Sequence, residues 1–353
     1  MPFKPAPRIR KHAKPLEPLV DPAGWTADEL AASDDWIYEL SEAEQADICK
    51  AVSHIEREGV PILDITRENF PLPEFDKGLA ALYDELLEGR GFFLIRDVPV
   101  EGFTKEQAAI AFWGIGTRLG RTVSQNTKGH MLGHVKALGQ DYEDQLARGY
   151  QTADEMHFHS DMCDYVALMC LHPSKSGGAS RIASSVTLYN ELLKLNADFV
   201  EDLVKDFYFT KYNESKDGKP SWYTMPVFSF QDGYFSSKGI GSRIMKAQNI
   251  PDVPKFTELR QQAVAAYLDK VNEIYFDMDF LPGDIQVLHN HVMLHSRTAF
   301  EDWPESDRKR HLIRLWLCDD HGRPTASGFR DELRGIVIHD VEPSAPLDNF
   351  EPV

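Results

Sequence analysis

The pattern of hydrophobic residues changes near Gly120, and this change limits the folds that the chain can adopt. Before it, apolar residues recur at helical spacing, and Ser or Thr caps precede some of these segments. After it, short β-rich runs alternate with turns rich in glycine and proline. Helices followed by strands predict an α+β fold with a β-sandwich or barrel core.

The segments that carry these patterns can be placed along the chain. A capping box at Ser41 and Glu44 opens the first clear helix, and Thr104 caps a later one that runs to about Leu119. The other expected helices cover residues 76–88, 186–195 and 255–271. The expected strands cover residues 91–96, 165–171, 274–280, 284–288 and 311–318. The last two helices therefore interrupt the strand-rich part of the chain.

Proline content divides the chain into a short arm and one domain. Six prolines fall within residues 1–24, where they disfavour any packed helix or strand, so we expect an arm lying on the surface. We expect a single domain over residues 25–353, because all-β domains often exceed the usual domain length. It comprises a helical part over 25–119, a β-rich core over 120–320 and a C-terminal tail over 321–353.

Charge and cysteine usage narrow the classes of partner. With 38 basic and 56 acidic residues the net charge is −18, which disfavours nucleic-acid binding and requires a local Arg or Lys cluster for any anionic substrate. No apolar run reaches the ~18 residues that span a bilayer, and the basic N-terminus lacks the apolar stretch of a signal peptide. Four cysteines without a CxxC pair predict neither a disulfide framework nor a zinc knuckle. We expect a cytoplasmic protein, and these features are compatible with a homo-oligomer.

Two histidines and one aspartate form a candidate metal site. His159 and Asp161 are two positions apart, so on an extended strand both side chains project from the same face. This short motif is weak alone, but His295 lies in the imidazole-rich segment 288–297 and could complete the site. Two histidines and one carboxylate with open positions are diagnostic of non-haem Fe(II) oxygenases. Zinc would more often recruit cysteine or a third histidine.

Two arginines follow His295 in the sequence and could lie near the metal site. Arg310 lies fifteen positions after His295, and Arg314 lies four positions further on, so both point to one face of a strand beside the metal. A buried guanidinium needs an anion, and a carboxylate fits its fork in a bidentate manner. Lys309 and His311 fall on the opposite face, where we expect solvent or an interface.

Together these residues resemble the TauD/TfdA family of Fe(II)- and 2-oxoglutarate-dependent dioxygenases, over about Gly91 to Leu317. The first 90 residues show no family motif. The resemblance implies a double-stranded β-helix (jelly-roll) core with flanking helices and a helical insertion. It rests on five motifs in the family's order: His159-Ser160-Asp161, Gly177-Gly178-Ala179-Ser180, Pro282-Gly283-Asp284, Asn290 with His295, and Arg310 with Arg314.

The resemblance also implies a role for each matched residue. His159, Asp161 and His295 would ligate Fe(II), while Arg310 and the hydroxyl of Ser180, where the family more often has Thr, would bind the distal carboxylate of 2-oxoglutarate. Arg314 matches an arginine that contacts an anionic substrate group in some members. Reaction with O2 would release succinate and CO2. Related halogenases replace the acid with a small residue, so the retained Asp161 favours hydroxylation, desaturation or dealkylation.

Other candidates rest on weaker signals. Polar residues on loop-like sequence before the first ligand could face the substrate, although turns and lid packing explain them equally well. The residues are Gln125, Asn126, Arg148 and Tyr150. The glycine-containing segment 233–241 fits either a mobile lid or a surface hairpin.

Several alternatives stay open at this point. His291 is the fallback for His295, with His157 and His289 also nearby, and the two arginines could form structural ion pairs. The preferred function is oxidation, most simply hydroxylation, of a small polar or anionic molecule. A zinc-dependent hydrolase with the same ligands, a non-catalytic jelly-roll binding protein and a protein-hydroxylating oxygenase are the rivals.

Overall fold

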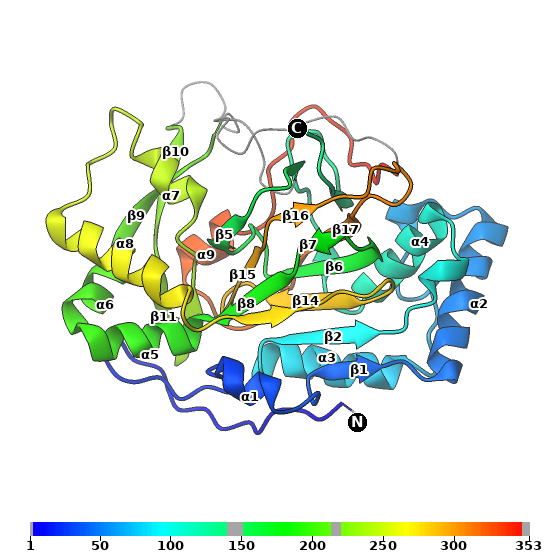
Figure 1. Ribbon diagram of the computed structural model, residues 1–353, viewed down its shortest axis with the longest axis horizontal. Coiled ribbons are helices and arrows are strands. Elements are labelled where there is room, and N and C mark those ends of the chain that lie inside the picture. The colour runs from blue at the N-terminus through cyan, green and yellow to red at the C-terminus, as the bar shows by residue number, and fades with distance from the viewer. Residues whose placement is uncertain (1–2, 140–150, 213–219, 348–353) are drawn as a thin grey trace.

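The computed structural model describes residues 3–139, 151–212 and 220–347, and two β-sheets with a common hydrophobic core form its centre (Figure 1). The larger sheet runs in the order β1 (Ile37–Glu39), β2 (Phe92–Arg96), β14 (Ile285–His289), β6 (Tyr165–His172), β17 (His311–Cys318) and β3 (Arg121–Thr122), with β4 (Gly133–Val135) also on β17. The smaller sheet runs in the order β13 (Phe276–Met278), β8 (Ser180–Ser184), β15 (Met293–Arg297) and β5 (Met156–His159). Apart from the parallel pair β1–β2, the neighbours in both sheets are antiparallel.

The larger sheet is buried on both faces, which explains the continuous apolar runs of its strands. Phe92 and Leu94 belong to the core that the two sheets share, whereas Phe93 and Ile95 belong to a second core beneath three helices. Those helices are α2 (Glu42–Glu58), α3 (Asp76–Glu88) and α4 (Lys105–Gly116). All eight residues of β17 are buried for the same reason. Strands covered on both faces lose the polar–apolar alternation of half-exposed strands.

The sequence patterns place α2, α3 and α4 correctly, whereas the short helix α1 (Ala27–Ala31), which Thr26 caps, was not predicted. Ser41 and Thr104 each cap a helix through a capping box, and α3 has the predicted bounds. The helix that begins after Thr104 ends at Gly116, before the predicted Leu119. The strand predicted over 274–280 is shorter, because only Phe276–Met278 pairs with β8.

An insertion between β8 and β13 forms the left end of the molecule in Figure 1. Its helices are α5 (Ser185–Leu195), α6 (Ala197–Leu203), α7 (Ser242–Ala247) and α8 (Glu258–Val271). Its hairpins are β9 (Asp206–Thr210) with β10 (Trp222–Pro226), and β11 (Phe228–Gln231) with β12 (Tyr234–Ser237). The two predicted helices correspond to α5 and α8, and segment 233–241 contains the second strand of a hairpin.

One prediction about the strand faces is wrong. His311 is buried rather than solvated, because β4 pairs with β17 and brings His134 against it, with 2.8 Å between His134 Nδ1 and His311 Nε2. A register shift between His311 and Leu312 also breaks the simple alternation of side chains at this point. Lys309 is partly exposed, as expected.

The N-terminal arm crosses the surface without helix or strand over residues 3–24, as its prolines predict. It is fixed at several points. Arg10 forms ion pairs with Asp21 and Glu88, and the backbone N–H of Leu16 donates to the Tyr189 hydroxyl at 2.8 Å. The remaining short elements are α1 (Ala27–Ala31), α9 (Ser327–Glu332), the 3-10 helices η1 (Ile62–Asp64) and η2 (Val100–Gly102), and the pair β7 (Ser176–Gly177) with β16 (Phe300–Glu301). Within the described ranges, no helix combines the length and apolarity needed to cross a membrane.

Gly177 provides a test of the turn that leads into β8. Its φ is +70°, and a Cβ there would lie 2.3 Å from the Ala299 carbonyl oxygen. We predict that Gly177→Ala lowers the free energy of unfolding, measured by urea denaturation, by about 1–3 kcal/mol. The control is Gly102→Ala, where a Cβ meets nothing within 4 Å. Equal stability of the two variants would contradict the tight turn.

Candidate metal centre

The pairing of β5 with β15 brings together two histidines that are far apart in sequence. His295 lies opposite His159 in the register of these strands, and their ring centroids are 4.3 Å apart. Asp161 follows β5, with Oδ1 3.9 Å from His159 Nε2 and Oδ2 3.8 Å from His295 Nε2. Ligand atoms of the three residues lie within 4.8 Å of one another, and no other His, Cys, Asp or Glu group among the described residues meets this test. The predicted triad therefore comes together.

The fallback histidine lies elsewhere. His291 Nε2 is 2.8 Å from Asp164 Oδ1, in contact with a different carboxylate. His289 is buried against the ring of Tyr165, and His157 lies on β5 next to the triad with an exposed side chain. The carbonyl oxygen of His157 is 2.9 Å from His159 Nδ1, so an N–H at Nδ1 leaves the Nε2 lone pair for a metal.

The protonation states suit metal binding. Burial lowers the pKa of His295 to about 3, and burial also lowers the pKa of His159. Burial acts to raise the pKa of Asp161, yet the charge of Arg314, the charges that both histidines carry once acid protonates them, and the hydrogen bond from Trp316 together hold that pKa below its ordinary value. At neutral pH the centre therefore presents two neutral imidazoles and one carboxylate, the forms that bind metal.

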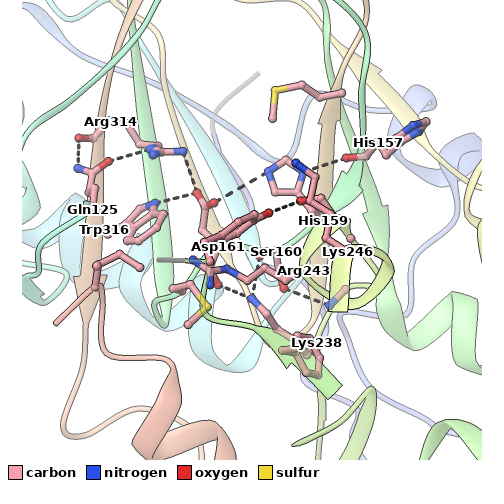
Figure 2. Close-up of a pocket in the computed structure, with 18 residues that line it drawn as sticks. Gln125, His157, His159, Ser160, Asp161, Lys238, Arg243, Lys246, Arg314 and Trp316 are labelled. Atoms are coloured by element: carbon pink, nitrogen blue, oxygen red, sulfur yellow. Dashed lines mark hydrogen bonds and ion pairs between the residues drawn. The ribbon is translucent and has the colours of Figure 1, made fainter. Parts of the chain in front are cut away.

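The carboxylate of Asp161 is held by two donors from β17 (Figure 2). Trp316 Nε1 donates to Asp161 Oδ2 at 2.8 Å, and Arg314 Nη1 donates to the same oxygen at 3.3 Å. Arg314 is in turn held by Gln125, whose Oε1 accepts from Arg314 Nε at 2.8 Å. We expected Arg314 to need an external anion, but it contacts the metal-site carboxylate and a glutamine.

The backbone beside Asp161 is also fixed. Lys238, which follows β12, is buried, and its Nζ donates to the carbonyl oxygens of Ser160 at 2.8 Å and Asp161 at 2.9 Å. The backbone N–H of Asp161 donates to Asn290 Oδ1 at 3.2 Å. Sequence reasoning missed both Trp316 and Lys238. Trp316 could have been found, because it lies two positions after Arg314 on the same strand face. Lys238 lies in the insertion, where no pattern marks it.

Arg310 lies beside the triad in a second part of the site. It is 4% exposed and lines a cavity together with Ser180, Leu312 and His295. Its Nη2 donates to the Gly178 carbonyl oxygen at 3.4 Å, and its Nη1 has no hydrogen-bond partner among the residues that the structure describes. Burial lowers the pKa of Arg310 to about 10, so it stays charged at neutral pH. A buried cation with an unused donor is suited to a carboxylate ligand.

The remaining predicted residues divide into four cases. Gln125 lines the pocket beside the metal centre, and it contacts that centre indirectly because its side-chain oxygen accepts a hydrogen bond from Arg314. Asn126 shapes a turn, because its Oδ1 accepts the backbone N–H groups of Lys128 and His130. Arg148 and Tyr150 lie outside the described residues. Ser180 donates its hydroxyl to Gln286 at 3.2 Å and faces the cavity of Arg310.

Comparison with known sequences shows which family and relatives the chain resembles. The family model described as "Taurine catabolism dioxygenase TauD, TfdA family" matches residues 57–316. FR-33289 synthase of Streptomyces rubellomurinus (strain ATCC 31215) is 28% identical over 318 residues, which cover 87% of this chain and 92% of that protein. Taurine hydroxylase-like protein SAT17 of Stachybotrys chartarum (strain CBS 109288 / IBT 7711) is 26% identical over 349 residues, covering 95% and 89%.

Solved structures share the fold. Asparagine oxygenase, solved in complex with Fe(II), 2S,3S-3-hydroxyasparagine and succinate, superposes with a TM-score of 0.62 at 16% identity, over 80% of this chain and 93% of that one. Non-heme iron oxygenase OrfP, in complex with Fe and alpha-ketoglutaric acid, gives a TM-score of 0.63 at 15% identity, over 80% and 94%. The predicted jelly-roll core with flanking helices is thereby confirmed.

The contact between Trp316 and Asp161 predicts a measurable effect on metal affinity. Trp316→Phe keeps an aromatic ring but removes the N–H that orients the carboxylate, so we expect Fe(II) to bind roughly 10- to 100-fold more weakly in anaerobic calorimetric titrations. Trp36→Phe is the matched control, because the Trp36 indole donates to the Ser33 carbonyl oxygen, outside the metal centre. An unchanged Fe(II) affinity in Trp316→Phe would refute this role.

Proposed function

The chain belongs to the taurine catabolism dioxygenase TauD, TfdA family, and on that premise we propose that it is an Fe(II)- and 2-oxoglutarate-dependent dioxygenase. Its substrate in this proposal is a small polar or anionic molecule, and the reaction is hydroxylation with release of succinate and CO2. The observation that carries the proposal is the position of the buried Arg310, which shares a cavity with His295 of the triad.

The donor set of the triad fits iron. His159, Asp161 and His295 would hold Fe(II) through two neutral nitrogens and one carboxylate oxygen, the ligand set of non-haem Fe(II) oxygenases. Within the described part of the chain, no cysteine or third histidine joins the group, as a closed zinc site would require. Trp316 and Arg314 keep the carboxylate oriented, so the three ligands need little rearrangement when the metal binds.

The cavity of Arg310 fits 2-oxoglutarate. The unused donor of Arg310 would bind the distal carboxylate, with the Ser180 hydroxyl beside it, and the keto acid end would then point toward His295 and the metal. Iron and 2-oxoglutarate together supply the oxidation, in which 2-oxoglutarate and O2 become succinate and CO2 while one oxygen atom enters a C–H bond of the substrate. The presence of Asp161 favours hydroxylation, desaturation or dealkylation over halogenation, and hydroxylation is the simplest of these.

Neither of the two rival functions explains all the features of the site. A zinc-dependent hydrolase would need an activated water at the triad but no buried arginine beside it. A non-catalytic binding protein would need neither the triad nor the donors that orient Asp161. Both rivals would leave the cost of burying the Arg310 charge unexplained.

An uncoupled turnover assay tests the proposed reaction. We expect the purified protein with Fe(II), ascorbate and labelled 2-oxoglutarate to form succinate slowly even without substrate. The Asp161→Ala and His295→Ala variants should form none, because each loses a metal ligand. Wild-type protein that forms no iron-dependent succinate would contradict the proposal, and hydrolytic activity with Zn(II) alone would favour the hydrolase.

Arg310 gives a separate test of the co-substrate site. Arg310→Gln removes a buried charged donor, so we expect the KM for 2-oxoglutarate in the uncoupled reaction to rise by at least about 30-fold, while Fe(II) affinity without 2-oxoglutarate stays near the wild-type value. Arg308→Gln is the control, because its side chain is exposed and stacks on Trp303. A KM that does not change in Arg310→Gln would exclude this carboxylate site.

A further inference from the structure

Asp161 lies outside the strand pairing that holds the first histidine of the triad. β5 ends at His159, and neither Ser160 nor Asp161 belongs to a helix or strand. Pairing with β15 therefore fixes the backbone of His159 but not that of Asp161. The direction in which a side chain leaves the backbone follows from the φ and ψ angles of its residue. Other contacts must therefore orient the backbone of Asp161.

A single lysine holds both of the peptide groups that flank Asp161. Lys238 Nζ donates to the carbonyl oxygen of Ser160 at 2.8 Å and to that of Asp161 at 2.9 Å (Figure 2). The first carbonyl belongs to the peptide group before the Asp161 Cα, and the second belongs to the peptide group after it. Asn290 Oδ1 accepts the backbone N–H of Asp161, so the first peptide group is held at both ends. Because peptide groups are planar, holding both of them fixes φ and ψ of Asp161.

Lys238 extends from a part of the insertion that is itself fixed against the metal centre. It directly follows β12, and its backbone N–H donates to the Val227 carbonyl oxygen at 2.8 Å. The backbone N–H of the next residue, Gly239, donates to Ser160 Oγ at 3.2 Å. A Cβ at Gly239 would lie 3.0 Å from the Ser160 backbone nitrogen, so the two backbones are in close contact. The ammonium group is therefore presented from a backbone of defined position.

Packing alone does not explain a lysine at this position. Lys238 is buried, and burial lowers the pKa of its ammonium group to about 8, so most of it stays charged at neutral pH. Burying a charge is costly, and a methionine of similar length would fill the space without that cost. A methionine could not donate a hydrogen bond to either carbonyl oxygen. The two hydrogen bonds are therefore the property that distinguishes the lysine.

We propose that Lys238 is a positioning residue for metal binding, which fixes the backbone of Asp161 and thereby holds its carboxylate between His159 and His295. Trp316 and Arg314 hold the same carboxylate at its oxygen, so Lys238 and these two residues act on opposite ends of Asp161. The inference rests on the metal site of the proposed function, but not on its reaction. It gives the insertion a part in metal binding.

Anaerobic calorimetric titration of the metal-free protein with Fe(II) tests the inference. We expect Lys238→Met to bind Fe(II) at least about tenfold more weakly than wild type. Loss of charge alone predicts the opposite, because removing a positive charge beside a bound dication strengthens its binding. Lys238→Gln keeps an N–H donor on a shorter side chain, so its affinity should lie between the two. Lys205→Met, at an exposed lysine of the same insertion that pairs with Glu201, is the control and should bind Fe(II) like wild type.

The visible absorption spectrum of the Co(II)-substituted protein is a second readout, because it reports the geometry of the ligands without turnover. We expect Lys238→Met to change this spectrum and Lys205→Met to leave it unchanged. Fe(II) binding in Lys238→Met that is as tight as in wild type or tighter, or an unchanged Co(II) spectrum, would overturn the positioning role. If Lys238→Met does not fold, the same two criteria apply to Lys238→Gln.

The outcomes separate this inference from the proposed function. Weaker Fe(II) binding in Lys238→Met supports the positioning role even if the wild type forms no succinate and the proposed function fails. If the wild type forms iron-dependent succinate but Lys238→Met binds Fe(II) equally well, the positioning role is excluded and the proposed function stands. Wild-type protein that binds no Fe(II) would overturn both.

Discussion

The antiparallel pairing of β5 with β15 is the constraint on which the site depends. It places His295 opposite His159, although the two residues are far apart in the sequence, and Asp161 follows two positions after the end of β5. A slip of one residue would turn one histidine to the other face of the sheet. Pairing of β15 with β8 on its other side, from Met293 opposite Ser184 to Arg297 opposite Ser180, limits such slips.

Basic residues lie on two sides of the metal centre. On one side, Arg310 is buried next to His295 and suits the carboxylate of a co-substrate. On the other side, Arg243 and Lys246 belong to the insertion and line the pocket in front of His159. The jelly-roll core supplies the first side and the insertion the second. The residues of the metal and co-substrate sites therefore come from the sheets and the segments next to them, whereas the insertion contributes to the pocket in front of the metal centre.

Much of this could be predicted from the sequence, because the relevant signals are local. Capping boxes marked the start of α2 and α4, the spacing of its leucines marked α3, and the spacing of His159 and Asp161 placed both on one side of the chain. The contacts of Arg314 could not be predicted, since its partner Gln125 comes from a distant loop. The burial of His311 depends on β4, a three-residue strand without a clear pattern. The role of Lys238 could not be predicted either, because its position depends on how the insertion folds.

Anomalous X-ray diffraction from crystals grown anaerobically with Fe(II) and 2-oxoglutarate tests the central claim most directly. The account predicts one iron peak in contact with His159, Asp161 and His295, with the distal carboxylate of 2-oxoglutarate paired with Arg310. Iron bound at other residues, or 2-oxoglutarate bound away from Arg310 while the triad holds the metal alone, would contradict it.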